Sequence, residues 1–287
     1  MSVMTRLLGT ATLLIASAQA LAQPLTLNTY NPLDAAVFPV SSTLISGHKD
    51  AILVDAQFST KEANELIALV KSSGKNLTTI FISAGDPDFY FGLEALTQAF
   101  PNAEVLATPA TVAYIEKTRA PKLEYWAPIL KDTAPKTTLV PKALKGNTLT
   151  LEGQKIEVVG SNPEQTSLWI PSIGALVGGV QVSANIHLWL ADAQTPEARA
   201  EWIKALDQFA ALKPKTVVPG HYLGEPAKNA DDLRFTREYL VAVEQELPKA
   251  KNSAELIKAM KARYPNLLDD SSLEMSAKVL KGEMKWP

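Results

Sequence analysis

The sequence predicts an α/β protein in which strands and helices alternate and pack in layers. Three observations indicate this class. Between residues 50 and 117, short β-branched or aromatic runs alternate with segments whose apolar residues recur at helical spacing. From 147 to 180 the pattern is that of two hairpins, followed by another helix. The 287 residues are 46% hydrophobic and 20% charged, which is typical of a globular protein with a large core.

The first residues predict a signal peptide over residues 1–22, and therefore a secreted or periplasmic protein. Arg6 precedes an apolar run, and Ala20-Leu21-Ala22 has the small-residue pattern of a cleavage site. The run is too short to span a bilayer, and an N-terminal core helix is the alternative. No later stretch is long and apolar enough to cross a membrane, so we expect no integral membrane segment after cleavage.

Charge and cysteine content exclude several classes of partner and site. The formal net charge is -2, which gives no basic surface for nucleic acid, so we expect no nucleic-acid partner. The absence of cysteine excludes disulfides and thiolate metal ligands.

The first strands follow the predicted signal peptide. Leu25 to Tyr30 and Ser42 to Ser46 are expected to be edge strands, and the apolar run Ala51 to Asp55 a buried one. Gly47 to Asp50 has turn composition, so His48 is expected on the surface and not in a metal site.

A capping box predicts where the first helix begins. Ser59 and Glu62 have the spacing at which a hydroxyl and a carboxylate satisfy the first free amides, and Gly74 marks the end. The buried face is expected at apolar positions with helical spacing: Ala63, Leu66, Ile67 and Val70.

Further elements follow along the chain. We expect a strand at 78–82, a helix at 92–100, a strand at 104–107 and a helix from 109 to about 117. Residues 119–148 are expected to form a long loop that crosses the face of the domain. Trp126 in this loop either lines a pocket or covers the core.

The second half begins with hairpins. Strands are expected at 148–151 and 155–159, and again at 166–170 and 174–180. A helix over 196–212 begins at the Thr195 cap, and an apolar strand then leads to His221.

The end of the chain is predicted to be helical. Helices are expected to begin near Asp231, Ser253 and Asp270. The predicted organisation is a signal peptide (1–22), an α/β domain (23–228) and a helical cap packed on it (229–287), since no flexible linker precedes the last part.

One loop resembles a known motif. Residues Ser83 to Gly92 follow a buried strand and carry two carboxylates, at the edge where α/β folds place their sites. The loop resembles the metallo-β-lactamase superfamily motif Thr/Ser-His-x-His-x-Asp-His-x-x-Gly, and Val217 to His221 resembles the segment with that family's last histidine. The resemblance covers residues 40–225 and implies an αββα sandwich with a C-terminal helical extension.

The resemblance also implies a site that has lost most of its ligands. In the family, five histidines and two aspartates hold two metal ions, usually zinc, and a shared hydroxide attacks the substrate. Matching the motif places Ala84, Asp86 and Phe89 at ligand positions, and matching the strand end Gly178 to Val180 with the family's Gly-Asp places Val180 at another. Only Asp88 and His221 are kept. The chain has three histidines, so five histidine ligands are excluded by counting.

Two functions follow as hypotheses. The first is an exported, non-catalytic pseudoenzyme that binds a small molecule and has no cofactor at the dinuclear site. The alternative is an atypical hydrolase of small esters, lactones or amides, in which Asp86, Asp88 and His221 hold one zinc, iron or manganese ion. Asp-Pro-Asp is also an ordinary helix start.

His187 has two interpretations. A subgroup of the family has a similar His-x-Trp-Leu segment beside its pocket, so this histidine can contact a ligand. It can equally pack in a polar niche of the core.

Overall fold

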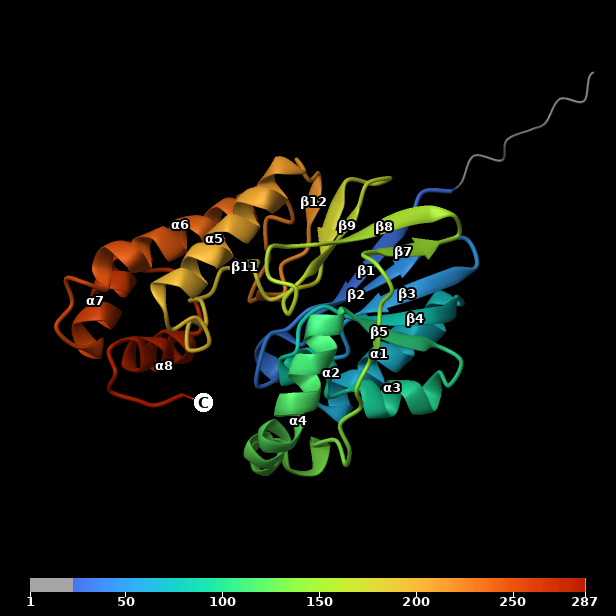
Figure 1. Cartoon of the computed structure of the whole chain (residues 1–287), viewed down its shortest axis with the longest axis horizontal. Coiled ribbons are helices and arrows are strands. Elements are labelled where there is room, and N and C mark those ends of the chain that lie inside the picture. The colour runs from blue at the N-terminus through green and yellow to red at the C-terminus, as the bar shows by residue number, and fades with distance from the viewer. Residues whose placement is uncertain (1–22, 287) are drawn as a thin grey trace, which may run out of the picture.

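The computed structural model describes residues 23–286, so the predicted signal peptide at 1–22 lies outside the described residues. Two β-sheets stack face to face, and helices cover their outer faces (Figure 1). The predicted α/β class and the αββα sandwich with C-terminal helices are therefore confirmed.

The first sheet has the order β1-β2-β3-β4-β5-β6. Its first three strands pair antiparallel and the later ones parallel. The strands are β1 (Thr26–Tyr30), β2 (Ser42–Ser46), β3 (Asp50–Val54), β4 (Asn76–Ile82), β5 (Glu104–Ala107) and β6 (Lys142–Ala143).

The second sheet has the order β12-β10-β9-β8-β7, and a small parallel pair, β11 and β13, lies apart from it. The strands are β7 (Thr148–Leu151), β8 (Gln154–Val159), β9 (Ser167–Ile170), β10 (Ala175–Val177), β11 (Ser183–Ala184), β12 (Thr216–Val217) and β13 (His221–Tyr222). Both predicted hairpins are confirmed.

The helices within residues 23–286 include none that is long and apolar enough to cross a membrane. They are α1 (Thr60–Ser73), α2 (Pro87–Tyr90), α3 (Leu93–Ala99), α4 (Pro109–Leu130), α5 (Pro196–Ala211), α6 (Ala230–Glu246), α7 (Ser253–Arg263) and α8 (Asp270–Leu280), with short 3₁₀ turns η1 (Leu33–Ala35) and η2 (Lys131–Thr133).

Side chains of a buried strand point alternately to the two faces of its sheet and so contribute to two separate hydrophobic cores. In β3, Ile52 and Val54 enter the core between the two sheets, whereas Ala51 and Leu53 enter the core under α1 and α3. Successive side chains point to opposite faces of a strand, so a strand covered on both faces must be apolar throughout.

The predicted start of α1 is confirmed with one difference. The Ser59 hydroxyl accepts a hydrogen bond from the Lys61 amide, and the Gly74 cap has a left-handed φ of 66°. The Glu62 carboxylate accepts from the Ser59 hydroxyl instead of from a backbone amide. Ala63, Leu66 and Val70 are buried as expected.

The prediction that Ser42–Ser46 forms an edge strand is wrong. This strand, β2, pairs with β1 on one side and β3 on the other, and all five of its residues are buried. The interior position follows from pairing with β1, which the local sequence pattern does not encode.

The predicted loop over 119–148 is wrong in its first part. Helix α4 continues to Leu130 and contains Pro121 and Pro128. A proline removes one backbone hydrogen bond, and packing can offset that cost. Leu123 and Trp126 pack against the core under α1 and α3, so tertiary contacts keep this segment helical.

The C-terminal helices share a core with the second sheet. Buried residues of α5 to α8 pack together with Leu176 of β10 and Val217 of β12. The caps lie just ahead of the predicted starts, at Asn229, Asn252 and Asp269. The domain boundary at 228/229 stays a prediction.

Candidate functional site

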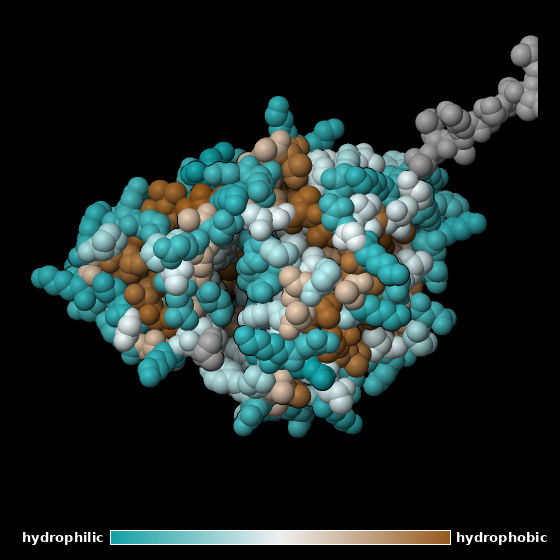
Figure 2. Space-filling model, in the orientation of Figure 1, coloured by the Kyte–Doolittle hydropathy of each residue, from teal (hydrophilic) through white to brown (hydrophobic). Residues whose placement is uncertain are grey.

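A cavity of about 560 Å³ lies between the α2–α4 region and the C-terminal half of the chain. The surface in Figure 2 is hollowed along the line where these parts meet. Among the sequence-predicted residues, those that border the cavity are Asp86, Asp88, Phe89, Val180, His187 and His221. The chain therefore brings segments from both halves together at one site.

Three strand ends are tied together beneath the cavity. Asp55, directly after β3, accepts hydrogen bonds at 2.8 Å from both the amide and the hydroxyl of Ser83, directly after β4. The Ser83 hydroxyl in turn accepts from the amide of Gly179, beyond β10. This network fixes the start of the 83–92 loop against both sheets.

Asp55 is fully buried, and its charge is costly there. Burial raises the pKa of Asp55 to about 7, and the charge of Asp88 adds to the rise, while the hydrogen bonds from Ser83 oppose it. The carboxyl thus changes protonation near neutral pH.

Asp88 and His221 form the central contact of the site. The imidazole Nε2 lies 2.7 Å from Asp88 Oδ2, and Asp88 is only 6% exposed. Asp88 comes from α2 and His221 from β13. The Phe89 ring packs edge-on against the imidazole at 5.4 Å, so the pair has an apolar wall on one side.

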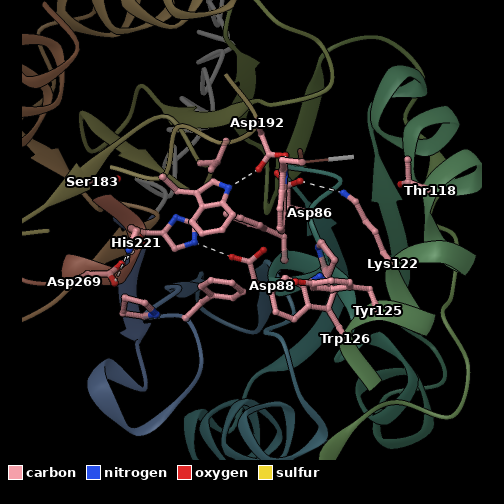
Figure 3. Close-up of a pocket in the computed structure, with 18 of the residues that line it drawn as sticks. Asp86, Asp88, Thr118, Lys122, Tyr125, Trp126, Ser183, Asp192, His221 and Asp269 are labelled. Atoms are coloured by element: carbon pink, nitrogen blue, oxygen red, sulfur yellow. Dashed lines mark hydrogen bonds and ion pairs between the residues drawn. The ribbon is translucent and has the colours of Figure 1, made fainter. Parts of the chain in front are cut away.

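Asp86 faces a different partner. Its carboxylate lies 3.2 Å from the Nζ of Lys122 in α4 (Figure 3). The same ammonium lies 3.2 Å from the Tyr114 hydroxyl. Asp86 precedes α2 at the capping position, but its side chain does not cap the helix. The three predicted metal-binding side chains are therefore divided between two separate contacts.

Burial also shifts the ionisation of this second pair. Burial raises the pKa of Asp86 to about 6, and Asp192 and Asp88 add to the rise, while Lys122 opposes it. For Lys122, desolvation lowers the pKa, but the neighbouring Asp86 and Tyr114 outweigh it and the pKa is raised. Each charge favours ionisation of the other, but for Asp86 the effect of burial is larger.

The other positions that the sequence analysis matched to ligands of the family carry apolar side chains packed in the core. Ala84 is fully buried and pairs with Gln165 of the loop before β9. Phe89 is fully buried, and Val180 packs against the same core. The assignment of these positions to individual ligands of the family stays a prediction.

His187 lies in a polar niche at the edge of the cavity. Its Nδ1 is 2.9 Å from the Tyr239 hydroxyl, and its Nε2 is 3.9 Å from Asp270. Burial lowers the pKa of His187, which favours the neutral ring. The ring contacts the buried Tyr239 and also borders the cavity. Both interpretations, packing in a polar niche of the core and contact with a ligand, therefore remain supported.

Several residues of the site were missed by the sequence analysis. Lys122 and Tyr114 lie on α4, and Trp189, Asp192 and Trp286 lie on the later loop and tail. Trp126, for which the sequence left two interpretations open, both borders the cavity and packs on the core residue Phe58 at 5.2 Å. For Lys122 the missing information was that α4 continues beyond residue 117, whereas the positions of Trp189, Asp192 and Trp286 depend on contacts between distant segments.

The dinuclear centre implied by the resemblance does not fit these residues. Within residues 23–286, no group of three or more histidine, aspartate or glutamate side chains is placed to hold a metal ion. Asp86 faces an ammonium, which repels a cation, and Phe89 and Val180 supply no electron pairs. A metal-bridging hydroxide is therefore not assigned to this site.

Comparisons with known proteins agree with the geometry of the fold. The model of the metallo-beta-lactamase superfamily matches residues 35–166. A beta-lactamase domain protein from Burkholderia ambifaria is similar in structure, with a TM-score of 0.62, 17% identity, and coverage of 90% of this chain and 87% of that chain.

A second solved structure, a metallo-beta-lactamase family protein from Thermus thermophilus, gives a TM-score of 0.60 at 18% identity, covering 88% of this chain and 91% of that one. At such identities the likeness concerns the fold alone. No curated protein matches the sequence.

Proposed function

Because this chain is a metallo-β-lactamase-fold protein whose residues 35–166 match the superfamily model, we propose that it is a non-catalytic relative that binds a small molecule in the cavity. The predicted signal peptide at 1–22 supports action outside the cytoplasm. The small number of metal-binding side chains that face the cavity supports a non-catalytic role.

The contact between Asp88 and His221 carries this proposal. Each of the two side chains that match the family's ligands is the hydrogen-bond partner of the other, at 2.7 Å. A metal ion would have to replace this bond, and the rest of its coordination would have to come from a surrounding that includes Phe89 and Val180. Binding of two ions is therefore disfavoured by both donor number and geometry.

The cavity itself suits a small ligand. Its volume of about 560 Å³ is within the range of small-molecule sites, roughly 300–1,000 Å³. Tryptophan, tyrosine and phenylalanine side chains border it together with a few carboxylates and lysines. Such a lining supplies contact area and a few directional polar groups, which is typical of a ligand site.

A mononuclear hydrolase of small esters, lactones or amides is the second candidate. It is favoured by one observation, the adjacent carboxylate and imidazole of Asp88 and His221 at the cavity wall. Asp86 would have to leave Lys122 to complete a three-donor set, and the ion would supply a Lewis acid and an activated water.

Metal content separates the two functions. The protein is purified without chelator, incubated with zinc, iron(II) or manganese, desalted and analysed for bound metal, with ester, lactone and amide hydrolysis followed in parallel. Sub-stoichiometric metal and no turnover are expected. The variant pair Asp88→Ala and His221→Ala is compared with His48→Ala, since His48 is exposed in a turn away from the cavity.

One tightly held metal equivalent, lost in the Asp88→Ala, His221→Ala protein and kept in His48→Ala, would establish the hydrolase candidate instead. Hydrolysis of an ester, lactone or amide that is lost in the Asp88→Ala, His221→Ala protein and kept in His48→Ala would also establish the hydrolase candidate.

A further inference from the structure

Five aromatic side chains border the cavity and form a closed circuit of ring contacts. Neighbouring ring centroids are 4.9–6.1 Å apart, and every contact in the circuit is edge-to-face. In order, the circuit runs Phe38, Trp126, Tyr125, Trp286, Trp189 and back to Phe38. Each ring therefore contacts two others, and the five rings form one continuous aromatic surface at the cavity.

The circuit is held in place by a carboxylate. The indole N–H groups of Trp189 and Trp286 both donate to Asp192, at 2.6 and 2.9 Å, one to each of its oxygens. Trp189 follows β11, whereas Trp286 belongs to the tail after α8. One carboxylate thus fixes the orientation of two rings before any ligand arrives, which lowers the entropy cost of binding.

Asp88 supplies a charge directed into this space. Figure 3 shows its carboxylate pointing to the middle of the cavity, with His221 on one side and Trp126 and Tyr125 on the other. The side chain is 9% exposed and uses Oδ2 for the contact with His221. Among residues 23–286, no hydrogen bond reaches its other oxygen. A carboxylate oxygen at a cavity wall that has no protein partner can accept a hydrogen bond from a donor on a ligand.

The balance of charges around the cavity also favours a cation. Of the residues that the structure describes, four carboxylates border it, against two lysines and no arginine: Asp86, Asp88, Asp192 and Asp269, with Lys117 and Lys122. The Lys122 ammonium is an example of a cation bound at this cavity by an aromatic ring and a carboxylate. Its Nζ lies 4.5 Å from the Tyr114 ring centroid and contacts Asp86. Aromatic faces and carboxylates together are the usual surroundings of bound organic cations.

We infer that the ligand is an organic ammonium ion with an apolar body, whose charged end contacts the free oxygen of Asp88 while its body lies against the aromatic circuit. This inference rests on the proposed function, since it names the ligand class of the same cavity. The ammonium N–H groups donate to Asp88, and the rings of the circuit surround the attached carbons.

The test uses three probes that share one aromatic body and differ in charge: 2-phenylethylammonium, 2-phenylethanol and phenylacetate. Binding to the full mature chain is measured by isothermal titration calorimetry, with quenching of tryptophan fluorescence as a second readout. The ammonium is expected to bind at least about tenfold more tightly than the alcohol, and phenylacetate more weakly than both.

Variants locate the binding. Asp88→Asn keeps the side-chain shape and is expected to lower ammonium affinity about tenfold while leaving the alcohol unchanged. Trp286→Leu, in the tail beyond the last helix, is expected to lower ammonium affinity by at least about threefold. Asp132→Asn removes the same charge at an exposed position in η2 and is the matched control, with no change for either probe.

If 2-phenylethanol or phenylacetate bound as tightly as the ammonium, the inference that the ligand is a cation would be wrong, although the cavity could still bind a small molecule. Failure of all three probes to bind would also overturn the inference. The inference would also be wrong if the Asp88→Asn and Trp286→Leu proteins both bound the ammonium as tightly as the Asp132→Asn control. The proposed function fails through a different result, the metal uptake and turnover described above.

Discussion

The ammonium of Lys122 lies 3.2 Å from the Asp86 carboxylate and 4.5 Å from the centre of the Tyr114 ring. Lys122 belongs to the second half of α4, which continues past Pro121 to Leu130. The length of this helix therefore decides what Asp86 faces, and it places an ammonium beside a carboxylate that the hydrolase hypothesis assigns to a metal ion.

Replacing Lys122 with methionine is expected to raise the pKa of Asp86 further above about 6. The lysine charge opposes the effect of burial, and methionine keeps the apolar stem without the charge. The measurement is a carboxyl ¹³C NMR titration. Lys117→Met, which removes an exposed lysine at the same cavity, is expected to move the pKa of Asp86 much less. An equal effect of both variants would show that no specific pair exists.

Replacing His221 with alanine is expected to destabilise the protein by about 1–3 kcal/mol, because Asp88 is left buried without its partner. Urea unfolding monitored by circular dichroism gives the free energy of unfolding. His48→Ala is the control, and its exposed turn position predicts a change within about 0.5 kcal/mol. Similar losses in the two proteins would contradict the assigned role of the contact.

The ionisation of Asp55 predicts a pH dependence of stability. Its pKa rises from 3.8 in the unfolded chain to about 7 in the folded one, so the folded state binds this proton more tightly. The resulting stabilisation is complete below 3.8 and is lost as pH rises through about 7, at roughly 1.4 kcal/mol per pH unit within that window.

Asp55→Asn removes this titration and keeps an oxygen acceptor for Ser83. Urea unfolding of both proteins between pH 3.8 and about 7 gives their free energies of unfolding. As pH rises, the wild type should steadily lose stability relative to the variant. A difference that stays constant with pH would contradict the raised pKa.

Gly92→Ala is expected to destabilise the protein by about 3 kcal/mol or more. An added Cβ would lie 2.0 Å from the Ala56 carbonyl oxygen and 2.9 Å from the Ala63 Cβ, and backbone cannot move aside cheaply. Gly282→Ala is the comparison, with a φ of +71° but no neighbour within 4 Å, and should cost about 1 kcal/mol. Thermal and urea unfolding measure both. A smaller loss at Gly92 than at Gly282 would contradict the packing argument.

This close approach gives Gly92 a structural role in the fold. Gly92 allows the 83–92 loop to pack against the segment after β3 and against α1. Its role is in the fold, so it does not depend on a metal centre.

Much of the fold could be predicted because local patterns encode it. The cap at Ser59, the apolar run of β3 and the strands of the 148–159 hairpin can each be recognised from neighbouring residues. The interior place of β2 and the helical second half of α4 could not be predicted in this way. They depend on pairing with β1 and on packing against a core assembled from distant segments.

The sequence by itself determined which donors exist: three histidines and no cysteine, too few for a five-histidine site in any fold. Only the tertiary structure decided which of them meet. His221 contacts Asp88 across 133 positions, Lys122 contacts Asp86 across 36, and Trp286 reaches Asp192 across 94. Residue types are fixed by the chain, whereas contacts between distant segments depend on how the sheets and helices pack, so the chemistry of the cavity follows from the topology.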